Sequence, residues 1–276
     1  MSDEPQTGAA SVLGGEGWEL KPGSTPLLVS IPHAGTHVPE DIAVCMTDVG
    51  RAMPDTDWHM DRLYAFATEL GAGILKADIS RYVVDLNRPA DGGPLYPGRC
   101  ETGLCPVETF SGEPVYQEGY VPDEDDIRER VDRYWRPYHE QLRVELNRLR
   151  DEFGRVVLWE AHSIRSRVPR LFDGVLPDLN FGTHDGRSSA PDLAGALYAV
   201  VEQHDSYSAV LNGRFKGGYI TRSYGDPDRG VHAVQLEIAQ RTYMQESDPG
   251  ILLKERLKPL QDLLRSLLKV VLEHEF

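Results

Sequence analysis

A dispersed set of imidazoles and carboxylates could carry chemistry in this sequence. His33 follows the predicted strand 27–31, and it is either a metal ligand or a loop histidine bonded to a backbone carbonyl. His162 directly follows the buried run 156–161, where an ionisable group must either be hydrogen-bonded or have a function. Glu237 lies in an apolar segment. There it could accept a proton from a metal-bound water, or it could pair with an arginine.

The neighbouring candidates have simpler explanations. Asp57 stands near the start of a predicted helix, where an acid also complements the helix dipole, and Asp61 follows one turn later. His37 lies four residues after His33, but the prolines around the pair argue against a helix that would aim both at one metal. Ser163 has no oxyanion-hole signature beside it, so a supporting hydroxyl is favoured over a nucleophile.

Several common active-site motifs are absent from the sequence. The patterns G-x-S-x-G, H-E-x-x-H and G-x-x-x-x-G-K-[ST] do not occur. The pair Gly71 and Gly73 lacks the third glycine of a dinucleotide fingerprint and is followed by strand residues. Nucleotide cofactors are therefore not supported.

Predicted strands and helices alternate along the chain. The predicted strands are 27–31, 74–77, 82–86, 155–161, 207–211 and 231–239, and the predicted helices are 56–70, 123–153, 191–204 and 249–274. This order predicts a three-layer α/β/α sandwich on a mixed, mostly parallel sheet. Ligands gather at the carboxyl ends of strands in such sheets, and His33, His162 and Glu237 fall at or near strand ends.

Two segments show no sustained periodicity of apolar residues. Residues 1–24 are small, polar and glycine-rich, which predicts a poorly ordered lead-in before a single domain at 25–276. Residues 89–122 are dense in Gly and Pro, and an irregular segment of this length is typical of a lid, a binding loop or disorder. Pro137 is expected to kink the helix 123–153.

Composition limits the partners of this chain of 276 residues. Its 44 acidic and 29 basic residues give a formal charge of −15, which would repel a nucleic-acid backbone. A small anionic substrate would need a local arginine cluster. No signal peptide or membrane span is evident, so we expect a cytoplasmic protein without a membrane partner. The odd set of three cysteines predicts free thiols.

Five short motifs in order resemble the N-formylglutamate amidohydrolase family. The resemblance covers about residues 26–245. The motifs are SIPHAG at 30–35, TDWHMDRLY at 56–64, SRYVVDLNRP at 80–89, AHS at 161–163 and QLEIA at 235–239. The family is similar in fold to zinc carboxypeptidases, which implies a phosphorylase/hydrolase-like sheet.

The resemblance also implies roles for named residues. It implies one zinc ion, or another divalent metal, on His33, Asp57 and His162, with Glu237 as the general base. The H-x-x-E pair of the peptidases is absent because Thr36 stands three residues after His33, so Asp61 is the alternative to Asp57. The residues expected to grip substrate carboxylates are Asn87, Arg88, Arg81, Arg165 and Arg222.

The activity implied is hydrolysis of N-formyl-L-glutamate to L-glutamate and formate, the last step of one route of histidine degradation. Two alternatives stay open at this point. The same metal chemistry could act on another N-acyl amino acid, because the sequence does not place the loops that shape the pocket. The chain could also be a metal-free binding module for acidic metabolites, with structural histidines.

Overall fold

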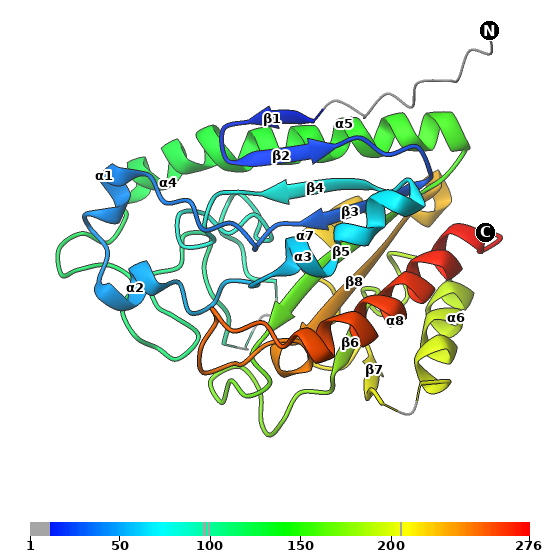
Figure 1. The fold of residues 1–276 in the computed structure, drawn as a ribbon. Helices are drawn as coiled ribbons and strands as arrows, with labels where there is room; N and C mark the ends of the chain where they lie inside the picture. Colours follow the sequence, from blue (N-terminus) through cyan, green and yellow to red (C-terminus); the bar gives the residue numbers. More distant parts are fainter. Residues whose placement is uncertain (1–11, 96–97, 99, 205) are drawn as a thin grey trace, which may run out of the picture.

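One eight-stranded mixed sheet forms the centre of the molecule (Figure 1). The computed structural model describes residues 12–276 except 96, 97, 99 and 205. The strands are β1 Leu13–Gly15, β2 Trp18–Lys21, β3 Leu27–Ile31, β4 Gly73–Ala77, β5 Val156–Ile164, β6 Leu179–Gly182, β7 Ala209–Leu211 and β8 Val231–Ala239. Their order is β1-β2-β4-β3-β5-β8-β6-β7. The central strands β4, β3, β5 and β8 run parallel. On one side of them, β2 pairs antiparallel with both β1 and β4, and on the other side β6 pairs antiparallel with β8.

Helices cover both faces of the sheet, as the three-layer prediction requires (Figure 1). Alternate residues of β3 point to opposite layers: Leu27 and Val29 join one apolar core, and Leu28 joins the other. The first core is closed by α3 Met60–Leu63, the 3₁₀ turn η1 Ala65–Leu70, α6 Pro191–Glu202 and α8 Lys254–Glu273. The second is closed by α4 Glu124–Arg130, the π turn η2 Val131–Trp135, α5 Arg136–Phe153 and α7 Tyr219–Tyr224.

The predicted long helix at 123–153 exists but has three parts. Asp123 caps α4 and forms a capping box with Asp126, so local sequence sets its start. The π turn η2 precedes Pro137, which occupies the first turn of α5 and has no N–H to continue the preceding helix. Gly154 ends α5 in a left-handed conformation.

Three predictions of local structure are wrong. The run 82–86 is no strand but a series of turns, because Asp85 accepts the N–H of Asn87 and its carbonyl accepts that of Arg88. The helix expected at 56–70 is interrupted, with only α3 and η1 helical. Strands β1 and β2 begin well before residue 25, and β2 pairs with β4, so residues 13–21 belong to the sheet. Residues 1–11 of the predicted lead-in lie outside the described residues.

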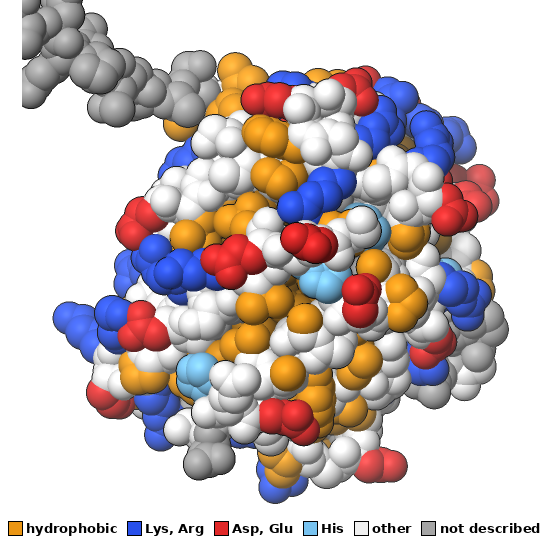
Figure 2. Space-filling model, turned by 90° about the vertical axis from the view of Figure 1, so that its right-hand side faces the viewer, with side chains coloured by type: hydrophobic (Ala, Val, Ile, Leu, Met, Phe, Trp, Pro, Cys, Tyr) orange, Lys and Arg blue, Asp and Glu red, His pale blue; other side chains and the backbone are white. Residues whose placement is uncertain are grey.

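Smaller elements complete the chain, and the sequence did not predict them. They are β6, α7, the short helices α1 Glu40–Ala43 and α2 Asp48–Ala52, and the 3₁₀ turns η3 Pro227–Arg229 and η4 Gln240–Thr242. In the part of the chain that is described, no helix is both long enough and apolar enough to cross a membrane. On the face shown in Figure 2, basic, acidic and hydrophobic side chains are interspersed.

Candidate metal centre and active site

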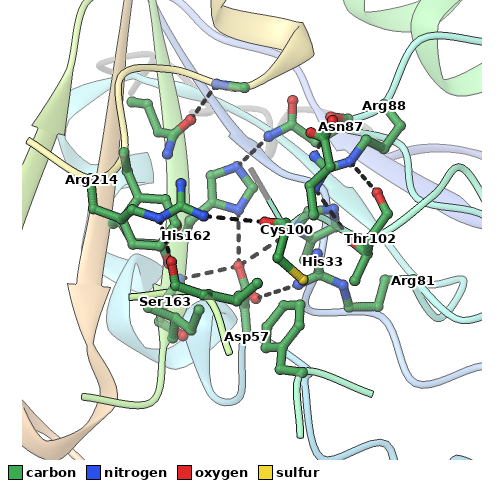
Figure 3. A pocket seen from close by; sticks show the side chains of 18 residues that line it. His33, Asp57, Arg81, Asn87, Arg88, Cys100, Thr102, His162, Ser163 and Arg214 are labelled. Carbon is green, nitrogen blue, oxygen red and sulfur yellow. Dashed lines mark hydrogen bonds and ion pairs between the residues drawn. The ribbon is translucent and has the colours of Figure 1, made fainter. Parts of the chain in front are cut away.

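His33, Asp57 and His162 meet at the carboxyl ends of the central strands (Figure 3). One ligand atom from each lies within 4.8 Å of the others, and all three residues are buried. His33 follows β3 and His162 lies near the end of β5, and these strands are parallel neighbours. The backbone N–H of Asp57 donates to the carbonyl of His33 at 3.0 Å, which holds the loop before α3 against β3.

The structure separates these three residues from the alternatives. Asp61 lies exposed on α3, and His37 is also exposed, so neither belongs to the buried group. Ser163 supports Asp57, because its backbone N–H donates to Asp57 Oδ2 at 3.1 Å. The Ser163 hydroxyl contacts the hydroxyl of Tyr243 at 2.8 Å.

Each histidine of this group bonds a further carboxylate through its outer nitrogen. His33 Nε2 lies 2.6 Å from Asp85 Oδ1, and His162 Nε2 lies 2.7 Å from Glu160 Oε1. This leaves Nδ1 of His33 and Nδ1 of His162 facing Asp57 Oδ2, at 3.9 and 3.0 Å. Metal-binding histidines usually donate their second N–H to such a carboxylate, which fixes the ring orientation. The two imidazoles and one carboxylate therefore fit a divalent cation such as zinc.

Without a cation, burial, hydrogen bonds and neighbouring charges decide the protonation of this group. Burial opposes a charge on His162, but its hydrogen bonds to Asp57 and Glu160 outweigh burial and raise its pKa well above the usual value. Burial, reinforced by the charge of Arg81, lowers the pKa of His33. Burial also opposes ionisation of Asp85, but the charges of His33, Arg81 and Arg88 hold its pKa well below the usual value.

Glu237 lies beside the three residues, on β8. It is the register partner of His162 across the parallel β5–β8 pair, so both side chains emerge on one face. Glu237 is 7% exposed and lines the same pocket as His33, Asp57 and His162. Burial raises the pKa of Glu237 to about 8. A carboxylate with a pKa near neutrality can exchange protons with a substrate in both directions.

Comparison with known proteins identifies the family. The sequence profile described as N-formylglutamate amidohydrolase matches residues 25–244. The chain belongs to the N-formylglutamate amidohydrolase family. It is 50% identical over 250 residues to the N-formylglutamate deformylase of Pseudomonas putida, covering 91% of this chain and 93% of that protein. It is also 50% identical over 253 residues to the enzyme of the same name from Pseudomonas aeruginosa PAO1, covering 92% and 95%.

Solved structures agree with the α/β fold. The N-formylglutamate amidohydrolase of Ralstonia eutropha JMP134 superposes with a TM-score of 0.79 at 24% identity, covering 93% of this chain and 97% of that one. A gene product of Agrobacterium tumefaciens superposes with a TM-score of 0.69 at 20% identity, covering 93% and 96%. At these identities, the likeness establishes the fold.

The pocket gathers the motifs that resemble the amidohydrolase family. Each of the five motif segments contributes at least one lining residue, and the cavity volume is about 620 Å³, counting the part open to solvent. Asn87, Arg88 and Arg81, three of the residues expected to bind substrate, line it. The segment predicted as a lid or binding loop supplies Thr102 and Phe110 to the same wall. The family's motifs therefore converge on one cavity.

The five residues expected to bind substrate differ in their positions. Arg81 is buried and pairs with Asp85 at 3.0 Å, and Arg88 donates to the Thr102 carbonyl at 2.8 Å. Asn87 donates an amide hydrogen to Glu160, lies 3.0 Å from His162 Nε2 through the same Nδ2, and accepts the N–H of Ile220, so it holds the site together. Arg165 and Arg222 are not among the residues that line the pocket.

Sequence analysis missed several residues of the site. Glu160 had a signal, since it stands two residues before His162 on one strand and so faces the same side. Asp85 lies inside a family motif without an assigned role. Arg214 and Gln235 also line the pocket. Arg214 comes from an irregular segment whose place only the tertiary structure reveals; its guanidinium donates to the Cys100 carbonyl at 3.4 Å (Figure 3).

Proposed function

We propose that this chain hydrolyses N-formyl-L-glutamate to L-glutamate and formate. The observation that carries the proposal is the placement of Glu237 opposite His162, beside the buried group His33, Asp57 and His162. The Pseudomonas relatives, named N-formylglutamate deformylase, support the choice of substrate at 50% identity over nearly the whole chain.

We propose one zinc ion as the cofactor, held by Nδ1 of His33, Nδ1 of His162 and a carboxylate oxygen of Asp57; another divalent metal could substitute. When bound there, the cation would polarise the formyl carbonyl and acidify the attacking water. Asp85 and Glu160 would keep both imidazoles oriented through their Nε2 atoms. Arg81 would fix Asp57 and Asp85, since its guanidinium contacts both carboxylates.

Glu237 would move the protons. Its carboxylate accepts a proton from the attacking water, holds it, and delivers it to the nitrogen of the leaving glutamate. Burial favours the protonated carboxyl and a nearby cation favours the ionised form, so the two influences act in opposite directions on its pKa. This balance suits a group that must both accept and release a proton.

Cationic side chains of the pocket would bind the two substrate carboxylates against the net charge of −15. Arg88 and Arg214 are placed for this task, because they approach the cavity from opposite sides (Figure 3). Arg165 and Arg222 remain weaker candidates, since they contribute no lining to this cavity. Binding energy at the carboxylates would orient the formyl group toward Glu237.

Formate release from N-formyl-L-glutamate by purified protein tests this function. Turnover should disappear with a chelator, return with zinc, and be lost in His162→Ala and Glu237→Ala. Turnover with other N-acyl amino acids but not with N-formyl-L-glutamate would show that the proposed substrate is wrong. Tight glutamate binding without metal or turnover would favour a binding module. The role in histidine degradation and the cytoplasmic location stay predictions.

A further inference from the structure

The amide of Gln235 enters the pocket with a fixed orientation. Gln235 lies on β8, is 3% exposed, and lines the cavity. Its Oε1 accepts the backbone N–H of Gly218 at 2.6 Å. Because an N–H can bond only the oxygen of the amide, this contact identifies which end is the oxygen and turns the NH₂ group away from Gly218.

The NH₂ group of Gln235 is left for the cavity. Oε1 is engaged by Gly218, and the residue lines the pocket together with Glu237 and His162. An amide NH₂ group offers two donor hydrogens. A substrate in this cavity can supply the acceptor for them.

Packing around Gly218 keeps this amide in place. A Cβ at position 218 would lie 2.3 Å from Nδ2 of Asn87, so the backbone approaches Asn87 as closely as glycine allows. Asn87 is itself fixed by Glu160 and by the N–H of Ile220. The Gln235 amide is therefore held in advance of any ligand.

We propose that Gln235 is a specificity-determining residue that donates hydrogen bonds to the side-chain carboxylate of the glutamate moiety. The inference rests on the proposed function, because it takes the formyl carbon to lie between Glu237 and the group His33, Asp57 and His162. It adds to the arginines of the pocket a neutral donor for the acidic side chain, which distinguishes the substrate from other N-formyl amino acids.

Distance along β8 selects this carboxylate over the one at the α-carbon. Gln235 and Glu237 are two residues apart and face the same side, a separation of about 6.6 Å at a strand rise of ~3.3 Å per residue. In extended N-formylglutamate, the side-chain carboxylate carbon lies five bonds from the formyl carbon, roughly 6 Å. The α-carboxylate carbon lies three bonds away, roughly 4 Å. Only the side-chain carboxylate is therefore far enough from the formyl carbon to contact Gln235.

A neutral donor suits this end of the cavity. The NH₂ group offers two hydrogens to carboxylate oxygens without adding a second buried charge. N-formyl-L-glutamine presents one oxygen and an NH₂ group of its own, so one of the Gln235 hydrogens would meet a donor. N-formyl-L-aspartate is one methylene shorter and would stop short of the amide.

The test is the variant Gln235→Glu, assayed in zinc-loaded enzyme with N-formyl-L-glutamate and N-formyl-L-glutamine. A carboxylate keeps an acceptor for Gly218 but replaces the donors by a repelling charge. We expect KM for N-formyl-L-glutamate to rise at least about 30-fold, as for loss of charge-assisted hydrogen bonds. The preference for the glutamate over the glutamine substrate should fall by a similar factor or reverse. Gln235→Met, which removes the donors without a charge, should lower the preference less.

Two controls isolate the effect. Gln203→Glu adds the same charge on the exposed end of α6 and should leave the kinetics unchanged. A general effect on Glu237 or on the metal would change kcat for both substrates alike and cancel in their ratio. An unchanged ratio in Gln235→Glu, with zinc content and melting temperature retained, would overturn the proposal.

Binding of the product separates this proposal from the proposed function. Calorimetric titration with L-glutamate needs no turnover. If wild-type protein fails to release formate, the deformylase function is wrong. The Gln235 assignment then stands only if wild-type protein binds L-glutamate and the Gln235→Glu variant loses that binding. Equal affinity of both proteins for L-glutamate, or none in the wild type, would reject the assignment.

Discussion

Glu237 and His162 lie directly opposite each other on the neighbouring parallel strands β8 and β5. Because partners in register project to the same side, the sheet itself places the carboxylate beside the imidazole without help from a loop. The same pairing sets Gln235 opposite Glu160. These two residue pairs of β5 and β8 thus supply the proposed base Glu237 and the proposed metal ligand His162, together with Glu160 and Gln235 beside them.

The variants of this pair should separate chemistry from metal binding. Glu237→Gln preserves size but cannot accept a proton, so kcat should fall at least about 10³-fold while zinc binding is kept. His162→Ala should lose both activity and zinc. Zinc content by atomic absorption and formate release in the same preparations check this. Loss of zinc in Glu237→Gln would instead make Glu237 a ligand.

The carboxylates on the outer ring nitrogens should control metal affinity. Asp85→Asn and Glu160→Gln leave His33 and His162 in place but remove the charge at Nε2, so zinc should bind about 10- to 100-fold more weakly. Competition with a chromogenic chelator measures this. Asp48→Asn, whose side chain is 97% exposed, serves as the control. Equal zinc affinity in all three variants would contradict the orienting role.

Metal binding should release a proton. The pKa of His162 is raised well above its usual value by Asp57 and Glu160 against the opposing effect of burial, so metal-free protein carries a proton that the cation must displace. Apparent zinc affinity should therefore increase with pH up to the folded-state pKa of His162. Calorimetry in buffers of different ionisation enthalpy counts the protons. A pH-independent affinity would show that His162 is neutral before binding.

Glu237 should destabilise the metal-free protein at neutral and alkaline pH. Its folded-state pKa is about 8, above the usual value of 4.5, so ionisation costs folding free energy as pH rises from about 4.5 to 8. Glu237→Gln should stabilise the metal-free protein by about 4 kcal/mol near pH 8 and little near pH 4. Urea unfolding at both pH values measures the difference. An equal effect at both pH values would mean that the pKa is not raised.

The arginines should differ in their effect on substrate binding. Arg88→Lys removes the planar donor fork from a residue that lines the cavity, and KM for N-formyl-L-glutamate should rise about 10- to 100-fold. Arg165→Lys changes a residue outside the lining, where the guanidinium contacts Asp55, and KM should change less than about 3-fold. The reverse order would place the substrate carboxylates on the Arg165 side.

The sequence by itself predicted the layered α/β fold and the three residues that the structure brings together as a candidate metal group. The apolar runs of β3, β5 and β8 predict buried strands, because both faces of these strands are covered by a core. His33, His162 and Glu237 stand out as ionisable groups in or beside these apolar runs. The family motifs added Asp57, whose local sequence also suits an ordinary helix start. The structure brings Asp57, and not Asp61, to the histidines.

Only the tertiary structure decided which polar groups surround these residues. Arg214 comes from an irregular segment, and the run 82–86 turns back on itself through Asp85, so neither has a periodic signal. Arg165 and Arg222 look equivalent to Arg88 in sequence, but chain folding places them outside the lining. Long-range contacts fix such positions, because a loop's path depends on what it packs against and not on its own residues alone.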